Sequence, residues 1–330
     1  MDREQEELQF LGFFGIFKES IKLILTCSKI FTKITLSLIL PLSFTFLSHI
    51  FLSMLLSSKI IHNEHTLDRT YEGTAAYNTT SAVISSELTA YWLIKAAYFT
   101  FLLIFSLLST AAVVYTVACV YTAKDITFRK VMSVVPKVWK RLMVTFLWSF
   151  AIVFIYNIFF IFIIVIWVVF IRGDHPGNAI VGLIIVIYFV GLVYLSMIWQ
   201  LAGVVSVLED RKGLQAMRKS KDLIKGKIVV ALALLLMLNL WVLLIQFLFE
   251  HFVVVGRSIG IAEKVGFGIV SLLLLSMAFL LGLVVQTVIY FVCKSYHHEN
   301  IDKSSLADHL EVYLGEYVPL KAKDLQLGEV

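Results

Sequence analysis

The sequence predicts an all-α integral membrane protein with six transmembrane helices in three hairpins, each preceded by a basic amphipathic interfacial helix. The chain of 330 residues is 59% hydrophobic and 15% charged, with a mean hydropathy of +0.89. Soluble domains, by contrast, are about 45–50% apolar and about 25% charged. The apolar residues form six long runs, and the basic residues fall between them. We therefore expect one membrane domain, 34–293, between a cytosolic N-terminal segment, 1–33, and a cytosolic tail, 294–330.

The six spans follow from the length of the apolar runs. A helix that crosses a hydrocarbon core of about 30 Å needs about 20 mostly apolar residues. The segments that meet this requirement are 34–56, 97–121, 142–170, 179–206, 228–249 and 265–293. Pro41 is expected to kink the first span. The polar, acidic start of the chain is unlike a signal peptide, so we expect the first span to be an uncleaved anchor.

Basic residues predict the orientation of these spans. Of the 28 Lys and Arg residues, 22 lie in the two termini and in the second and fourth loops, and six lie on the opposite side. Because basic residues concentrate in cytoplasmic loops, both termini are expected in the cytosol. Asn78-Thr79-Thr80 is a glycosylation sequon in the 57–96 loop, which the charge bias places outside. Asn78 is therefore a candidate glycosylation site, although three-residue sequons also arise by chance.

An amphipathic segment precedes each odd-numbered span. Near the N-terminus and in the second and fourth loops, apolar residues recur at spacings of three and four, which places them on one helical face. We expect each segment to lie in the interfacial plane with its apolar side in the acyl boundary, and Pro136 to separate the second segment from its span. Basic inner loops are common in multi-pass proteins, but these also suit anionic headgroups. The candidate lipid contacts are Arg129, Lys130, Lys137, Lys140, Arg218, Lys219, Lys221 and Lys225.

The tail is expected to contain a short acidic amphipathic helix over 304–317. Ser305 and Asp308 resemble a capping signature, and apolar residues from Leu306 to Tyr317 share one face. This helix would pack on the basic cytosolic face of the same molecule or dock to a protein partner. The adjacent His297 and His298 are expected to be solvated and not to bind a metal.

Signals of catalysis are absent from the sequence. All 51 charged residues lie outside the proposed span cores, which lowers the expectation of an ion-coupled carrier. No phosphate loop, dinucleotide fingerprint, metalloprotease motif or nucleophile elbow occurs, so we expect no enzyme, no cofactor and no nucleic-acid partner. Cys293, at the cytosolic end of the last span, is a candidate for palmitoylation. The polar residues inside the spans are expected to form interhelical hydrogen bonds: His49, Asn157, Gln200, Asn239, Gln246 and Gln286.

The segments 7–12, 293–300 and 313–320 resemble a land-plant family of multi-pass transmembrane proteins without assigned activity. The resemblance covers nearly the whole chain and implies a plant endomembrane or plasma-membrane location. The 213–227 segment is similar to a surface-helix pattern in the membrane domain of bacterial glycerophosphodiester phosphodiesterases. Those enzymes hydrolyse their substrates in a separate soluble barrel domain, which this chain lacks, so no catalytic residue carries over.

Two functions are compatible with these features. The first is a non-catalytic membrane protein that organises the bilayer or recruits partners, which the surface helices and charge-free spans favour. The alternative is a lipid-handling protein or a transporter of neutral or apolar solutes, for which the polar span residues would line the path.

Overall fold

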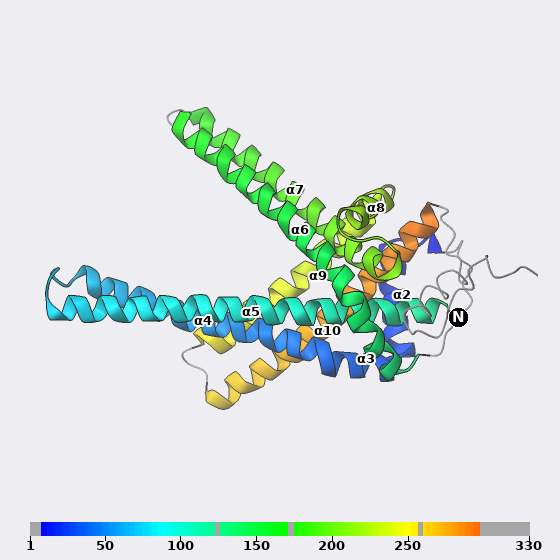
Figure 1. The fold of residues 1–330 in the computed structure, drawn as a ribbon, viewed down its shortest axis with the longest axis horizontal. Helices are drawn as coiled ribbons and strands as arrows, with labels where there is room; N and C mark the ends of the chain where they lie inside the picture. Colours follow the sequence, from blue (N-terminus) through cyan, green and yellow to red (C-terminus); the bar gives the residue numbers. More distant parts are fainter. Residues whose placement is uncertain (1–7, 123–125, 171–174, 257–259, 298–330) are drawn as a thin grey trace, which may run out of the picture. The chain divides into compact units, whose positions relative to one another are not determined.

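A computed structural model describes residues 8–122, 126–170, 175–256 and 260–297, and its secondary structure in these ranges is helical throughout (Figure 1). The α-helices are α2 (Phe13–Thr26), α3 (Ser28–Ile34), α4 (Leu40–Asp68), α5 (Ala75–Tyr121), α6 (Phe128–Phe170), α7 (His175–Leu208), α8 (Leu214–Ile224), α9 (Ile228–Phe249) and α10 (Ile261–Tyr296). Two π-helical segments, η1 (Thr35–Ile39) and η2 (Glu250–Val255), lie at the start of α4 and the end of α9.

Among the described residues, six helical stretches are long and apolar enough to cross a membrane, in agreement with the six predicted spans. They are Ser28–Asp68, Ala75–Tyr121, Phe128–Val168, Ile180–Leu208, Ile228–Val255 and Ile261–Tyr296. Each stretch extends beyond the apolar run that predicted it. Hydropathy marks where the hydrocarbon ends, whereas a helix continues until its backbone hydrogen bonds are broken.

The largest difference from the sequence prediction concerns the 57–96 segment, which was expected to be a loop. Helix α4 continues to Asp68 and α5 begins at Ala75, so only a six-residue bend separates them. Gly73 supplies a positive φ of 87° in this bend. The Asn63 amide donates to Glu87 Oε2 at 2.8 Å and ties the polar extensions of the two helices together.

The two prolines expected to disturb helices have different outcomes. Pro136 lies inside α6 without ending it, so the predicted separation of a surface helix from the third span is wrong. An interior proline removes a backbone hydrogen bond and costs roughly 3 kcal/mol, but the α6 valines around it are fully buried and offset this cost. Pro41 is the second residue of α4, and the five-residue π segment η1 directly precedes this helix. A π turn is one way of accommodating a missing backbone donor.

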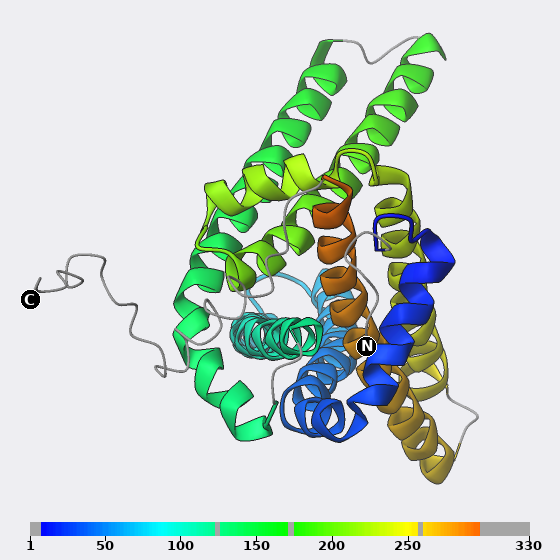
Figure 2. The same ribbon diagram turned by 90° about the vertical axis from the view of Figure 1, so that its right-hand side faces the viewer.

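The chain divides into two compact units. Unit 1 comprises Met1–Ile30, Thr110–Leu235 and Leu283–Val330, and unit 2 comprises Phe31–Ser109 and Leu236–Gly282. In unit 1 the C-terminal part of α5, seen nearly end-on in Figure 2, is buried on all sides. Its small residues Ala111, Ala112 and Ala118 are at most 2% exposed. Small residues let neighbouring helix backbones approach closely, which favours helix packing in membranes.

An apolar cluster joins three helices in the core of unit 2. Side chains from α4, α9 and α10 form it: Leu47, Ile245, Phe249, Leu275 and Ala278. Phe46 and Phe279 add an edge-to-face pair with ring centroids 6.0 Å apart. Dispersion contacts therefore hold these helices together in unit 2.

Candidate functional site

Helix α8 is docked on unit 1 through its apolar face. Ala216, Met217, Leu223 and Ile224 are all less than 9% exposed, and the helix packs against α6 and α7. The Ser220 hydroxyl donates across this contact to the Ile198 carbonyl of α7 at 2.8 Å. Full burial of an apolar side chain is worth roughly 1.5–3 kcal/mol. The prediction that this face lies in the acyl boundary is therefore wrong, because protein covers it.

Two glycines bracket α8 at positions that exclude larger residues. Gly213 has a φ of +60°, and a Cβ there would lie 2.8 Å from Trp148 Cδ1. The Gly213 amide donates to Thr145 Oγ1 at 2.8 Å, and that hydroxyl also bonds the Ser206 hydroxyl at 2.6 Å. Gly226 has a φ of +92°, and its Cβ would overlap the Tyr296 ring. Both ends of α8 are thus fixed by backbone conformations that favour glycine.

A polar network around Glu209 joins the ends of α6, α7 and α10. The Tyr290 hydroxyl donates to Glu209 Oε1 at 2.7 Å, and Lys294 Nζ lies 3.5 Å from the same oxygen. Glu209 and Lys294 side chains are only 14% and 19% exposed. Arg141 of α6 donates to the Glu209 carbonyl and pairs with Asp210 at 3.0 Å. Because Glu209 is largely shielded from water, these bonds hold the loop that leads into α8.

The C-terminal end of α8 is held by α10. Nε2 of His297 lies 3.1 Å from the Leu223 carbonyl and 2.9 Å from the Lys225 carbonyl. These carbonyls belong to the last turn of α8, where intrahelical donors run out. Lys227 Nζ lies 5.3 Å from the centre of the Tyr296 ring, within the range of a cation–π contact. His297 is exposed, as predicted, and it also acts as a helix-end partner of α8.

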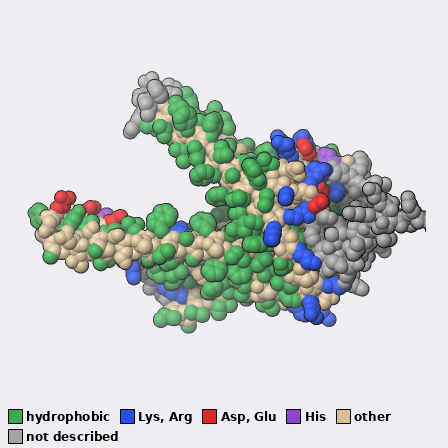
Figure 3. All heavy atoms as spheres, viewed as in Figure 1, with side chains coloured by type: hydrophobic (Ala, Val, Ile, Leu, Met, Phe, Trp, Pro, Cys, Tyr) green, Lys and Arg blue, Asp and Glu red, His purple; other side chains and the backbone are tan. Residues whose placement is uncertain are grey.

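The opposite face of α8 is basic and exposed. Arg218 and Lys221 are exposed and Lys219 is half-buried. Lys225 is exposed but pairs with Asp222 at 2.7 Å, and this hydrogen bond lowers the pKa of Asp222 and raises that of Lys225. Figure 3 shows Lys and Arg gathered around α8, while hydrophobic side chains predominate along the part of α6 and α7 that forms the hairpin. Of the predicted lipid contacts on α8, Lys225 therefore also serves as a partner within the helix.

The other four predicted contacts lie on the first turns of α6. Arg129, Lys137 and Lys140 are exposed, and Lys130 is half-buried. The apolar side of the same turns is buried at 0–1% exposure, in Val131, Val134, Val135 and Val138. This segment, like α8, presents its basic side outward and packs its apolar side on protein, contrary to the expected burial in lipid.

Helix α2 differs from these two segments. Phe14 is 82% exposed, and Phe10 just before the helix is 80% exposed. Lys18 and Lys22 are exposed beside them, while Ile16 and Leu23 on the other face are at most 1% exposed. An exposed face of aromatic and basic side chains suits the boundary between headgroups and acyl chains.

The predicted modification sites have different environments. Asn78 is exposed in the first turn of α5. Cys293 is 0% exposed, so palmitoylation of its thiol would require unit 1 to open. Cys27 is half-buried between α2 and α3, and burial raises the pKa of its thiol. A raised pKa disfavours the thiolate, which is the reactive form.

Some of the polar residues inside the spans form the predicted interhelical hydrogen bonds, and others do not. Asn157 of α6 accepts from the Tyr188 hydroxyl of α7 at 2.7 Å, and the Gln286 amide of α10 donates to the Gln200 carbonyl of α7. These bonds match the prediction. Gln246 instead donates to Glu250 within its own helical stretch. Nε2 of His49 is shielded from water and has no hydrogen-bond partner among the described residues.

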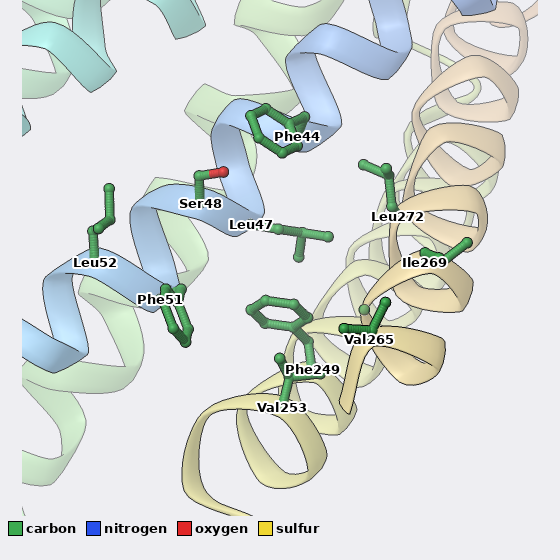
Figure 4. Close-up of a pocket in the computed structure, with 11 residues that line it drawn as sticks. Phe44, Leu47, Ser48, Phe51, Leu52, Phe249, Val253, Val265, Ile269 and Leu272 are labelled. Carbon is green, nitrogen blue, oxygen red and sulfur yellow. The ribbon is translucent and has the colours of Figure 1, made fainter. Parts of the chain in front are cut away.

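Two apolar clefts flank α4 in unit 2, each with a volume of about 450 Å³. In the first, shown in Figure 4, α4 side chains face Phe249, Val253 and residues of α10 across the cleft. Ser48 supplies the hydroxyl among its otherwise apolar lining residues. The second lies between α4 and α5 and contains His49 and Tyr98. Known sites for small molecules are clefts of similar volume with mostly apolar linings.

The sequence did not single out the residues that position α8. Glu209, Tyr290 and Lys294 come from distant parts of the chain, so no local spacing connects them. One signal was present: Glu209 and Asp210 form an acidic pair at the start of a strongly basic loop. Within the described residues no group of three His, Cys, Asp or Glu side chains is placed to hold a metal. The predicted tail helix, 304–317, lies outside the described residues.

Comparison with known proteins gives a family and no activity. No curated protein and no solved structure matches the chain. A family model described as Domain of unknown function (DUF8558) matches residues 1–330, and the chain therefore belongs to this family.

Proposed function

We propose that this protein is a non-catalytic, multi-pass membrane protein that organises anionic lipid at the cytosolic surface. One observation carries the proposal: α8 is fixed on unit 1 by its buried apolar face and by glycines at both ends, so its basic face is held outward. Because its backbone is already fixed, this cationic surface binds anions without first losing backbone freedom. Each basic residue near an anionic leaflet contributes about 1 kcal/mol.

The proposed membrane arrangement follows the charge bias. Three helical hairpins cross the bilayer, each preceded by a basic surface segment, with both termini in the cytosol of an endomembrane or the plasma membrane. The exposed Phe10 and Phe14 of the α2 region insert at the cytosolic interface, and Lys18 and Lys22 contact headgroups beside them. The tail, 294–330, is the proposed site for recruiting a protein partner.

Lipid composition around the protein tests this proposal. Full-length protein is extracted in native membrane discs, and its co-purifying lipids are quantified against those of the whole membrane. We expect wild type to enrich anionic lipid and the double variant Arg218→Glu/Lys221→Glu to lose at least threefold of that enrichment. The matched control, Lys59→Glu/Lys264→Glu, makes the same charge change on the opposite side and keeps the enrichment. Equal enrichment in wild type and the α8 variant contradicts the proposal.

A second candidate function is the handling of neutral lipid, favoured by the two apolar clefts of unit 2. Their lining residues among the described part of the chain include no Lys, Arg, Asp or Glu. An uncharged cargo therefore fits them, whereas a charged headgroup inside either cleft would be left unpaired.

A further inference from the structure

The basic face of α8 lies beside the point where the C-terminal tail leaves the helices. Arg218 and Lys221 are exposed on this face. Nε2 of His297 lies 2.9 Å and 3.1 Å from two carbonyl oxygens at the C-terminal end of α8. His297 is the last residue that the structure describes, so the rest of the tail, 298–330, starts next to this helix.

A second contact fixes the chain at the same point. The Tyr296 ring packs so closely on Gly226 that a Cβ there would overlap it. Lys227 Nζ lies 5.3 Å from the centre of the same ring. Because residues 296 and 297 are held against the end of α8, any contact between the tail and α8 is an intramolecular event that starts from a fixed anchor.

The tail carries the opposite charge to the exposed face of α8. Residues 298–330 include seven Asp and Glu residues and three Lys residues. The segment 304–317 contains Asp308, Glu311 and Glu316 and no Lys or Arg. Charges at a protein surface attract each other over about 10 Å at 0.1 M ionic strength. The acidic segment therefore complements the basic face of α8.

The connection between the anchor and this segment is long enough to reach the whole face. Arg218 precedes Ile224, the last residue of α8, by six residues, which is about 9 Å along the helix. Residues 298–307 span at most about 33–36 Å when extended and average about 16–19 Å as a flexible chain. A short flexible tether of this kind gives an effective concentration in the millimolar range.

From these observations we propose that the acidic segment 304–317 docks on the basic face of α8 and competes there with anionic lipid. Both need the exposed Arg218 and Lys221, so they exclude each other. Exposed ion pairs are individually weak, so the docked segment is displaced where anionic headgroups are dense and stays docked on a neutral membrane. The competition rests on the proposed binding of anionic lipid by α8, whereas the docking itself does not.

Zero-length crosslinking tests the docking in the full-length protein, with one chain in each phosphatidylcholine nanodisc. A carbodiimide joins a carboxylate to a lysine amine only where the two are in contact, and mass spectrometry maps the joined pairs. We expect crosslinks from 304–317 to Lys219 and Lys221. Arg218→Glu keeps both lysines but repels the segment, and it should lower these crosslinks at least threefold. Arg129→Glu makes the same charge change on α6 and should leave them unchanged.

Anionic lipid tests the competition. Nanodiscs made from an equal mixture of phosphatidylcholine and phosphatidylserine should lower the crosslinks from 304–317 to α8 at least threefold. In native membrane discs, the variant Asp308→Asn/Glu311→Gln/Glu316→Gln loses the competing segment. It should therefore enrich anionic lipid at least twofold more than wild type does.

The control for this variant is Glu299→Gln/Asp324→Asn/Glu329→Gln, which makes the same charge change elsewhere in the tail and should keep the wild-type enrichment. Crosslinks that spread equally to other exposed lysines, such as Lys18 and Lys140, overturn the docking site. Crosslinks that form only in discs with two chains make a second copy the occupant and also overturn it. Specific crosslinks that persist in anionic discs overturn the competition. Specific crosslinks in a protein that enriches no anionic lipid leave the docking in place and overturn the proposed function of α8.

Discussion

Unit 1 joins its helices through polar side-chain bonds in addition to apolar packing, whereas α4, α9 and α10 of unit 2 meet at an apolar cluster. In unit 1, Glu209 binds Tyr290 and Lys294, and Thr145 binds Ser206 and the Gly213 amide. In unit 2, α4, α9 and α10 meet at Leu47, Phe249 and Leu275. Directional bonds fix a short helix such as α8 in one orientation. Apolar packing between long helices is less specific and leaves clefts.

This difference suits the two proposed roles. A cationic surface that contacts headgroups must be held in place, because its affinity depends on several charges facing the same way. A site for an apolar ligand needs volume and few polar groups, and the two clefts of unit 2 provide both. The two units should therefore respond differently to the same kinds of substitution.

The largest effect is expected for Glu209→Ala in unit 1. Removing this carboxylate takes away the acceptor that the Tyr290 hydroxyl and the Lys294 ammonium share in a mostly buried setting. Breaking such a pair costs about 3–5 kcal/mol. We expect an unfolding free energy lower by this amount, measured by SDS titration in detergent micelles with tryptophan fluorescence.

The matched control is Asp222→Ala, which removes an exposed carboxylate from α8. An exposed ion pair contributes at most about 1 kcal/mol, so the loss should be small. If the two variants were destabilised equally, the Glu209 network would not hold unit 1 together.

A smaller effect is expected for Leu47→Ala in the core of unit 2. Leu→Ala substitutions in soluble cores cost about 2–5 kcal/mol, part of which is transfer from water. Lipid is as apolar as leucine, so in the membrane mainly the packing term remains. We therefore expect a loss of about 1–3 kcal/mol in the same titration.

Leu244→Ala serves as the control for this variant, because Leu244 is 55% exposed in unit 2 and should tolerate truncation. A loss at Leu47 as large as that at Glu209, or equal losses at Leu47 and Leu244, would contradict the contrast between the units.

Asn78→Gln is expected to have no measurable effect on stability. This variant instead tests on which side of the membrane the bend between α4 and α5 lies. Because α5 is helical from Ala75, Asn78 lies about 28 Å beyond residue 97, where the predicted apolar span begins. This distance keeps the sequon clear of the bilayer. Wild type expressed in eukaryotic cells should shift on endoglycosidase digestion, and Asn78→Gln should not shift.

Thr80→Ala is the second variant, because it destroys the sequon without changing Asn78, and it should also lose the shift. A sequon introduced into the 211–227 loop should remain unmodified. A glycan on that loop would reverse the proposed topology and place the basic face of α8 outside the cytosol.

The helix boundaries show how far local sequence determines this fold. The six spans were predictable because each needs only its own run of apolar residues. The helix ends were not predictable from hydropathy. The extensions of α4 over 57–68 and of α5 over 75–96 are polar, so hydropathy does not mark them as parts of spanning helices. The sequence also did not predict that α6 continues through Pro136. Burial of the surrounding valines compensates for the missing hydrogen bond, and that burial depends on the tertiary structure.

The sequence by itself determined the membrane class, the six spans and the basic segments, because composition and periodicity are properties of neighbouring residues. Tertiary structure alone decided what covers each apolar face. It placed the apolar sides of α8 and early α6 on protein, buried Cys293, joined Glu209 to Tyr290 and Lys294, and stacked His49 on Tyr98. These outcomes depend on residues from separate helices, whose approach in space no local pattern encodes.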